Sequence, residues 1–151
     1  MTKPNIILII SDDQGFSDYG FMNHAVAKTP NLDRIAAQGL LYTRSYTMPL
    51  CSPSLACLLT GKLPHQNGIT GNDLAAAESP AEKGKGKGNT TEKRSPRGPL
   101  LNQLLSNSLI LPKALTDAGY LAFQTGKLWN VTYKDVGFTS GMTVNASRHG
   151  D

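Results

Sequence analysis

The sequence predicts an α/β fold with a mainly parallel central sheet and helices on both faces. Residues 6–10 (I-I-L-I-I) form a continuous apolar run rich in β-branched residues, which is typical of a strand covered on both sides. Helix signals follow, and a further strand-like run, Tyr120–Gln124, comes directly after the last of them. The 151 residues suit one domain with a core of its own.

Two elements are expected between the first strand and residue 48. Thr29 suits a helix N-cap, Pro30 suits the first helical position, and Gly39 suits the end of the helix. The next segment, Leu40–Thr47, carries aromatic and β-branched residues and favours a strand. The apolar face of the helix would consist of Leu32, Ile35 and Ala36.

A short helix is expected over Pro53–Thr60, with Cys51 on the loop immediately before it. Ser52 is a good N-cap, and Gly61 suits the residue just past the helix end. A helix N-terminus offers unpaired N–H groups and a partial positive charge, which stabilise an oxyanion or a thiolate. On these local features alone, Cys51 could equally be a buried cysteine beside an ordinary capped helix.

The C-terminal half carries one more helix and strand. Leu111 begins a helix that Gly119 ends, and the following strand places Leu121 and Phe123 on one face. Lys127 follows at the C-terminal end of that strand, the edge at which open α/β sheets bind ligands. An ordinary exposed lysine is the alternative.

The net charge of +4 comes from one segment. Residues 82–97 hold six basic and two acidic side chains, so the rest of the chain is neutral. This segment lies in a low-complexity basic insertion at about residues 75–99, centred on K-G-K-G-K-G, which cannot bury apolar surface. A nucleic-acid interface would depend on this loop alone, and a solvated insertion is the simpler interpretation.

Neither a membrane span nor a signal peptide is indicated. No apolar run approaches the roughly 20 residues that cross a bilayer, and the run at residues 6–10 is shorter than a signal-peptide core. The chain as it stands therefore suggests the cytoplasm, without fixing a location. If Cys51 and Cys57 border one helix, their separation of six positions puts them about 9 Å apart along its axis, beyond the reach of a disulfide. Cys57 is expected to be a small core residue.

Polar residues with possible site roles follow two of the expected elements. Asp12 and Asp13 come at the C-terminal end of the first strand. Adjacent carboxylates repel each other unless a cation lies between them, and a hard divalent cation is the usual partner. A solvated turn is the alternative for this pair. His65 and Asp73, in the polar loop after the central helix, could line a pocket or simply lie on the surface.

Three segments carry a resemblance to a known family. C-S-P-S-L-A-C-L-L-T-G-K, from Cys51 onward, resembles the C-x-P-S-R and L-T-G-R signature of the formylglycine-dependent sulfatases. T-P-N-L-D-R-I-A-A-Q-G and A-G-Y…T-G-K-x-W resemble two further segments of that family. The resemblance implies that residues 1–151 are the N-terminal portion of a sulfatase domain with an alkaline-phosphatase-like fold. Two positions depart, because the family's arginine falls on Leu55 and a family histidine falls on Trp129.

The resemblance implies a hydrolase of sulfate esters. The formylglycine-generating enzyme would convert Cys51 to formylglycine, whose hydrated aldehyde is the nucleophile. Asp12, Asp13 and the modified Cys51 would bind calcium, and Lys127 would contact formylglycine and sulfate. His65 is a further candidate for substrate binding. Family members are several times longer, complete the calcium shell with a downstream Asp-Asn pair and are often exported.

Three other functions stay open. A non-catalytic or truncated relative would keep Cys51 as a thiol, and Leu55 favours this because leucine offers neither charge nor hydrogen bonds. A phosphatase or phosphodiesterase of the wider superfamily would share the aspartate pair but use Ser or Thr as the nucleophile. A nucleic-acid binder would act through residues 83–97.

Near the end of the chain, His149 and Asp151 could be metal ligands or an acid–base pair.

Overall fold

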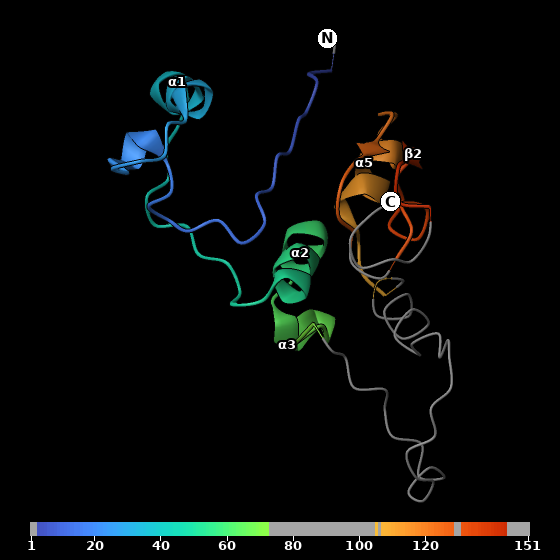
Figure 1. Ribbon diagram of the computed structural model, residues 1–151. Coiled ribbons are helices and arrows are strands. Elements are labelled where there is room, and N and C mark those ends of the chain that lie inside the picture. Colours follow the sequence, from blue (N-terminus) through green and yellow to red (C-terminus); the bar gives the residue numbers. More distant parts are fainter. Residues whose placement is uncertain (1–2, 73–104, 106, 129–130, 145–151) are drawn as a thin grey trace, which may run out of the picture. The chain divides into compact units, whose positions relative to one another are not determined.

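The computed structural model describes residues 3–72, 105, 107–128 and 131–144, which belong to two compact units, Met1–Tyr46 and Thr47–Asp151. The first unit contains the short 3-10 helix η1 (Gly20–Met22) and helix α1 (Pro30–Gln38). The second unit contains the helices α2 (Cys51–Thr60), α3 (Pro64–Asn67) and α5 (Leu111–Asp117) and the strands β1 (Phe123–Gln124) and β2 (Ser140–Gly141) (Figure 1).

Helix α1 begins and ends where the sequence predicts. Thr29 occupies the N-cap position, and Pro30 is the first helical residue. At the other end, Gly39 donates its N–H to the carbonyl oxygen of Ile35 at 2.9 Å. Gly39 has an extended backbone with φ −116°, so the helix ends here without a left-handed turn.

Two side chains at the start of α1 join it to η1. Thr29 Oγ1 accepts the N–H of Gly20 at 2.7 Å and donates to Asp33 Oδ1 at 2.7 Å. The same Asp33 oxygen accepts the N–H of Phe21 at 3.0 Å. A Cβ atom on Gly20 would lie 2.5 Å from the other Asp33 carboxylate oxygen, so any larger residue here would force the Asp33 side chain to move.

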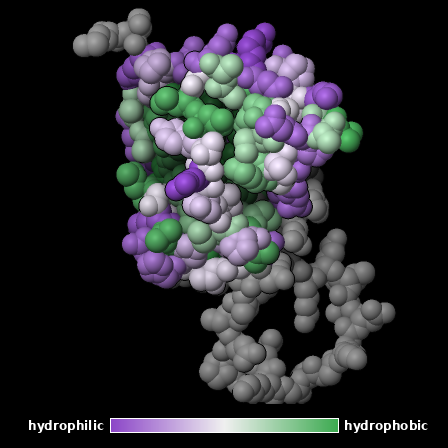
Figure 2. Space-filling model, turned by 90° about the vertical axis from the view of Figure 1, so that its left-hand side faces the viewer, coloured by the Kyte–Doolittle hydropathy of each residue, from purple (hydrophilic) through white to green (hydrophobic). Residues whose placement is uncertain are grey.

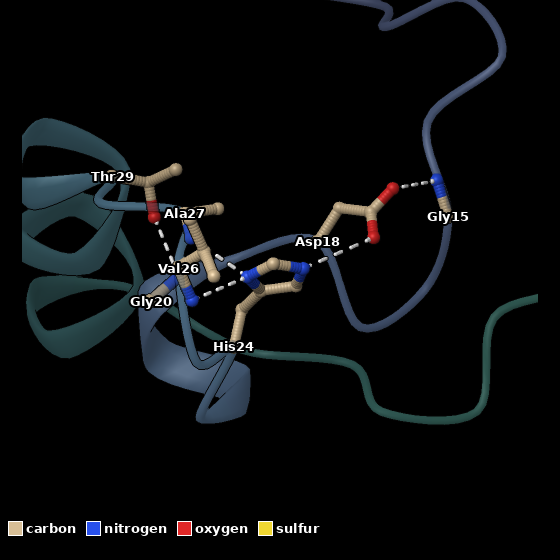
Figure 3. A network of polar contacts seen from close by, with 7 residues as sticks. All are labelled: Gly15, Asp18, Gly20, His24, Val26, Ala27 and Thr29. Carbon is tan, nitrogen blue, oxygen red and sulfur yellow. Dashed lines mark hydrogen bonds and ion pairs between the residues drawn. The ribbon is translucent and has the colours of Figure 1, made fainter.

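A second polar network fixes the loop that follows the acidic pair (Figure 3). His24 Nδ1 accepts the N–H groups of Val26 at 3.1 Å and Ala27 at 2.7 Å. Because Nδ1 is the acceptor, the proton of the neutral ring lies on Nε2, which faces Asp18 Oδ1 at 3.9 Å. Asp18 Oδ2 in turn accepts the N–H of Gly15 at 2.7 Å.

Two predicted strands of the first unit do not form in the described residues. Residues 6–10 have no strand pairing and expose between 47% and 84% of each side chain, and Leu40–Thr47 is also unpaired and mostly exposed. Figure 2 shows hydrophobic residues, in green, on the face of the molecule that is turned to the viewer. A continuous apolar run is buried as a strand only when strands pair with both its edges and elements cover both its faces. The expected apolar face of α1 is likewise open, with Leu32 and Ile35 exposed.

The described hydrophobic core lies in the second unit. Helix α2 contacts both α3 and α5, and it contributes Ala56 and Leu59 to the core. Leu55 and Phe138 pack against this cluster from partly buried positions. The packing fixes α2, and therefore the position of its N-terminus. The remaining core residues are Ile69, Leu105, Ile110, Leu128, Val131 and Val136.

Helix α2 begins earlier than predicted. Its first residue is Cys51, which was expected on the preceding loop, and Leu50 in an extended conformation is the N-cap. Ser52 is helical and buried, so its side chain does not cap the helix. The C-terminal prediction is confirmed, because Gly61 adopts the left-handed conformation at φ 64° and donates to the carbonyl oxygen of Cys57 at 2.8 Å.

Helix α5 also ends as predicted. Gly119 has φ 83°, and its N–H donates to Thr116 O at 2.8 Å. The N–H of Tyr120 donates to Leu115 O at 3.0 Å. These two bonds form a Schellman motif, which needs a left-handed residue that glycine adopts without strain.

Strand β1 pairs in parallel with β2, with Phe123 opposite Ser140 and Gln124 opposite Gly141. Parallel pairing beside helices agrees with the predicted α/β class, although the described sheet has only these two strands. The strand covers only two residues of the predicted Tyr120–Gln124, and Leu121 and Phe123, which were expected on one apolar face, are both exposed. The buried side chain of β1 is that of Gln124, which is 6% exposed.

Both cysteines are free, as predicted, and Cys57 is half-buried rather than part of the core cluster. Among the described residues, no helix combines the length and apolar character of a membrane span.

Candidate active site

The thiol of Cys51 lies at the N-terminus of α2. Cys51 is half-buried, and its Sγ donates a hydrogen bond to Asn72 Oδ1 at 3.4 Å. The backbone N–H of Ser52 donates to the same oxygen at 3.0 Å. The sulfur therefore lies at the positive end of the helix dipole, where negative charge is stabilised. Cys51 is thus the first residue of the helix rather than part of the loop before it, where it was expected.

Asn72 provides the acceptor for the first turn of α2 that the N-cap residue, Leu50, cannot provide. The first N–H groups of a helix have no partner within the helix. Leu50, at the N-cap, has no side-chain acceptor. The amide oxygen of Asn72, twenty positions after Ser52, accepts one of these N–H groups instead. No local sequence signal predicts this contact beyond the polar, glycine-punctuated character of the loop.

Leu55 stands at the position where the signature that this segment resembles has arginine, and it brings no polar group to the site. Its half-buried side chain packs against the hydrophobic core cluster, one helical turn after Cys51. It therefore contributes to the stability of α2 and offers no charge to the region around the thiol.

Lys127 follows a turn that buried polar groups hold in place. Gly126 has φ 76°, and its carbonyl oxygen accepts Gln124 Nε2 at 2.8 Å and Thr143 Oγ1 at 3.0 Å. Gln124 Oε1 accepts the N–H of Thr143 at 3.1 Å. The turn is thus tied to the segment after β2, and Lys127 is half-buried directly after it. Lys127 and Cys51 belong to the same compact unit.

Asp12 and Asp13 are exposed and belong to the first unit, whereas Cys51 belongs to the second. Asp13 has φ 53°, a left-handed conformation that aspartate tolerates better than most residues. Two adjacent carboxylates are hard oxygen donors suited to calcium, but they are only part of the 6–8 oxygens that this ion takes. The residues that the structure describes hold no group of three or more His, Cys, Asp or Glu side chains placed to bind a metal.

His65 lies on α3 and is exposed, so its role as a substrate contact stays a prediction. Several other candidates lie outside the described residues: Asp73, Trp129, His149, Asp151 and the basic insertion.

Comparison with known proteins gives one family. The family model described as Sulfatase matches residues 4–148. The chain is 37% identical over 134 residues to N-acetylgalactosamine-6-sulfatase of Homo sapiens and 36% identical to that of Canis lupus familiaris, covering 87% of this chain and 22% of each relative. It is 51% identical over 69 residues to arylsulfatase A of Bos taurus, covering 45% of this chain and 14% of the relative. The chain thus spans about a fifth of the length of the N-acetylgalactosamine-6-sulfatases.

Proposed function

Because the chain belongs to the sulfatase family, which has an alkaline-phosphatase-like α/β fold, we propose that it carries the nucleophile of a hydrolase that cleaves sulfate esters. The observation that supports this most strongly is the position of Cys51. The residue that the family signature assigns to the nucleophile is the first residue of α2, with its sulfur half-buried at the positive end of the helix.

Formylglycine, made from Cys51 by the formylglycine-generating enzyme, would supply a hydrated aldehyde. One of its hydroxyl groups would attack the sulfur of the substrate and displace the alcohol, and the other, once deprotonated, would expel sulfate and restore the aldehyde. The chain's own groups would stabilise the negative charge around it. The N-terminus of α2 contributes partial positive charge, and the ammonium group of Lys127 would pair with a sulfate oxygen. The bonds of Gln124 and Thr143 to Gly126 would keep the backbone before Lys127 in one conformation.

Asp12 and Asp13, together with the modified residue 51, would hold a calcium ion. The ion would supply positive charge next to the sulfate oxygens. The chemistry of the two carboxylates supports this assignment, and the remaining oxygen ligands that calcium needs would come from other groups.

The names of the relatives point to a substrate class. One relative is named for an N-acetylgalactosamine 6-sulfate and the other for an aryl sulfate. Their shared chemistry is the sulfate ester, and this is the substrate class that we assign.

The packing of Leu55 favours one other function. A relative that keeps Cys51 as a thiol and hydrolyses no sulfate ester would not need a guanidinium to stabilise formylglycine, and Leu55 instead packs against the core cluster.

A turnover experiment separates the two functions. The full chain is produced together with a formylglycine-generating enzyme and incubated with 4-nitrophenyl sulfate, and the released phenol is measured. Hydrolysis by the wild type and by Cys57→Ala, but not by Cys51→Ala, is the expected result. Equal release by the wild type and Cys51→Ala would contradict the proposed role of Cys51, and no release from any variant would favour the non-catalytic function.

A further inference from the structure

One side chain outside the signature segment contacts the reactive atom of residue 51. Asn72 Oδ1 lies 3.4 Å from Cys51 Sγ and 3.0 Å from the backbone nitrogen of Ser52, and it accepts a hydrogen bond from each. We propose that Asn72 is a positioning residue that orients the reactive atom at position 51. The proposal deepens the function proposed above and rests on it only in assigning the reactive role to residue 51.

The second hydrogen bond is what makes Asn72 able to orient its neighbour. The N–H of Ser52 belongs to the first turn of α2, whose position is fixed by packing on the core. An oxygen that accepts this N–H is held in a fixed place relative to the helix. A donor on the side chain of residue 51 then has one favourable direction, toward that oxygen, and the part-buried setting strengthens the preference.

The leucine at position 55, where the family signature has arginine, makes the contact with Asn72 important. Leu55 is packed against the hydrophobic cluster and cannot hydrogen-bond to residue 51. Among the hydrogen bonds of the described residues, Asn72 provides the side-chain contact to the Cys51 thiol. Asn72 therefore takes over the orienting contact for which leucine has no polar atom.

The same geometry suits the hydrated aldehyde. Its two hydroxyl groups are hydrogen-bond donors, as the thiol is, so Asn72 Oδ1 can accept from one of them. The other hydroxyl is then left to face the substrate. Asn72 transfers no proton in this arrangement, since an amide oxygen is an acceptor and not a base at neutral pH.

Thiol alkylation tests the contact in the native, unconverted protein. The folded chain is treated with iodoacetamide, and the modification rates of Cys51 and Cys57 are measured separately by peptide mass. Asn72→Ala should raise the rate at Cys51 about three-fold to ten-fold, the change expected when one ordinary hydrogen bond is lost. Cys57 is the internal reference, and its rate should stay constant.

Two further variants make the test specific. Asn72→Asp keeps an oxygen acceptor of the same shape, so its Cys51 rate should be no higher than that of the wild type. Thr70→Ala removes an exposed side chain from the same loop and should change neither rate. The proposal is overturned by an unchanged Cys51 rate in Asn72→Ala, by an equal increase in Asn72→Asp, or by a joint increase at Cys51 and Cys57, which would indicate a loosened unit.

This result does not depend on the proposed function. Alkylation requires neither formylglycine nor turnover, so a chain that hydrolyses no sulfate ester can still show the contact, and an active sulfatase can still lack it.

Discussion

Replacing Gln124 by leucine should loosen the turn that precedes Lys127. Gln124 is 6% exposed, its Oε1 accepts the N–H of Thr143 at 3.1 Å, and its Nε2 donates to Gly126 O at 2.8 Å. Leucine can make neither bond. The N–H of Thr143, a residue with 0% exposure, then has no partner, whereas the Gly126 carbonyl keeps the hydroxyl of Thr143 at 3.0 Å.

The magnitude follows from these bonds. An unpaired buried donor costs about 1–3 kcal/mol, and the better burial of leucine offsets a lost bond to a carbonyl that keeps another donor. A local loss of about 2 kcal/mol corresponds to a roughly 30-fold faster exchange of the Thr143 amide hydrogen.

Amide hydrogen exchange of the full chain, followed by NMR, measures this directly. The matched control is Gln38→Leu, the same chemical change at an exposed position of α1. Thr143 exchange that is unchanged in Gln124→Leu, or accelerated equally by both variants, would refute the reasoning that buried side-chain bonds hold the turn.

Three further predictions concern other parts of the chain. Leu55→Arg should raise the fraction of Cys51 that a formylglycine-generating enzyme converts, because it restores the signature, and the peptide mass measures this fraction. The same variant should lower the melting temperature in thermal unfolding, because a charged group meets the core. Leu58→Arg, at a position that is 49% exposed, should do neither, and conversion that is equal in the two variants would contradict the argument. Asp12→Asn should weaken calcium binding about ten-fold or more, because it removes a charged ligand, and titration calorimetry measures the affinity. An unchanged affinity would show that Asp12 is not a calcium ligand. Gly20→Ala should destabilise the first unit by about 1–3 kcal/mol, since the new methyl group would meet a carboxylate oxygen of α1, and an unchanged thermal transition would show that η1 can shift without cost.

The helix ends were predictable because the residues that decide them are close in sequence. Pro30 sets the start of α1, and Gly61 and Gly119 supply the left-handed residues that end α2 and α5. Each of these signals acts within one helical turn, so no distant contact can easily override it.

The strands were less predictable because pairing depends on partners far along the chain. Residues 6–10 have the composition of a central strand, but the described residues pair no strand with them. In β1 the buried side chain is the polar Gln124, and Phe123 is exposed, which is the reverse of the burial expected from hydrophobicity. Gln124 is buried because its side chain bonds to Gly126 on the turn and to Thr143 after β2. Hydrophobic periodicity does not predict such contacts.

The candidate site also has parts that the local sequence predicts and parts that depend on distant residues. The sequence predicted Cys51 on the loop just before a helix, whereas the structure makes it the first residue of that helix. The sequence also assigned the N-cap to Ser52, whereas the polar contact to the first turn comes from Asn72. A cap supplied from a distant loop leaves no spacing rule in the sequence, which is why this residue could be found only from the geometry.

The central claim is that Cys51 becomes the sulfatase nucleophile. Mass analysis of the peptide that contains Cys51, taken from the full chain produced with a formylglycine-generating enzyme, tests it most directly. The account predicts a peptide lighter than the cysteine form, by the difference between a thiol and an aldehyde, that reacts with an aldehyde-specific aminooxy reagent. A peptide that keeps the full cysteine mass and reacts only with thiol reagents would contradict the claim.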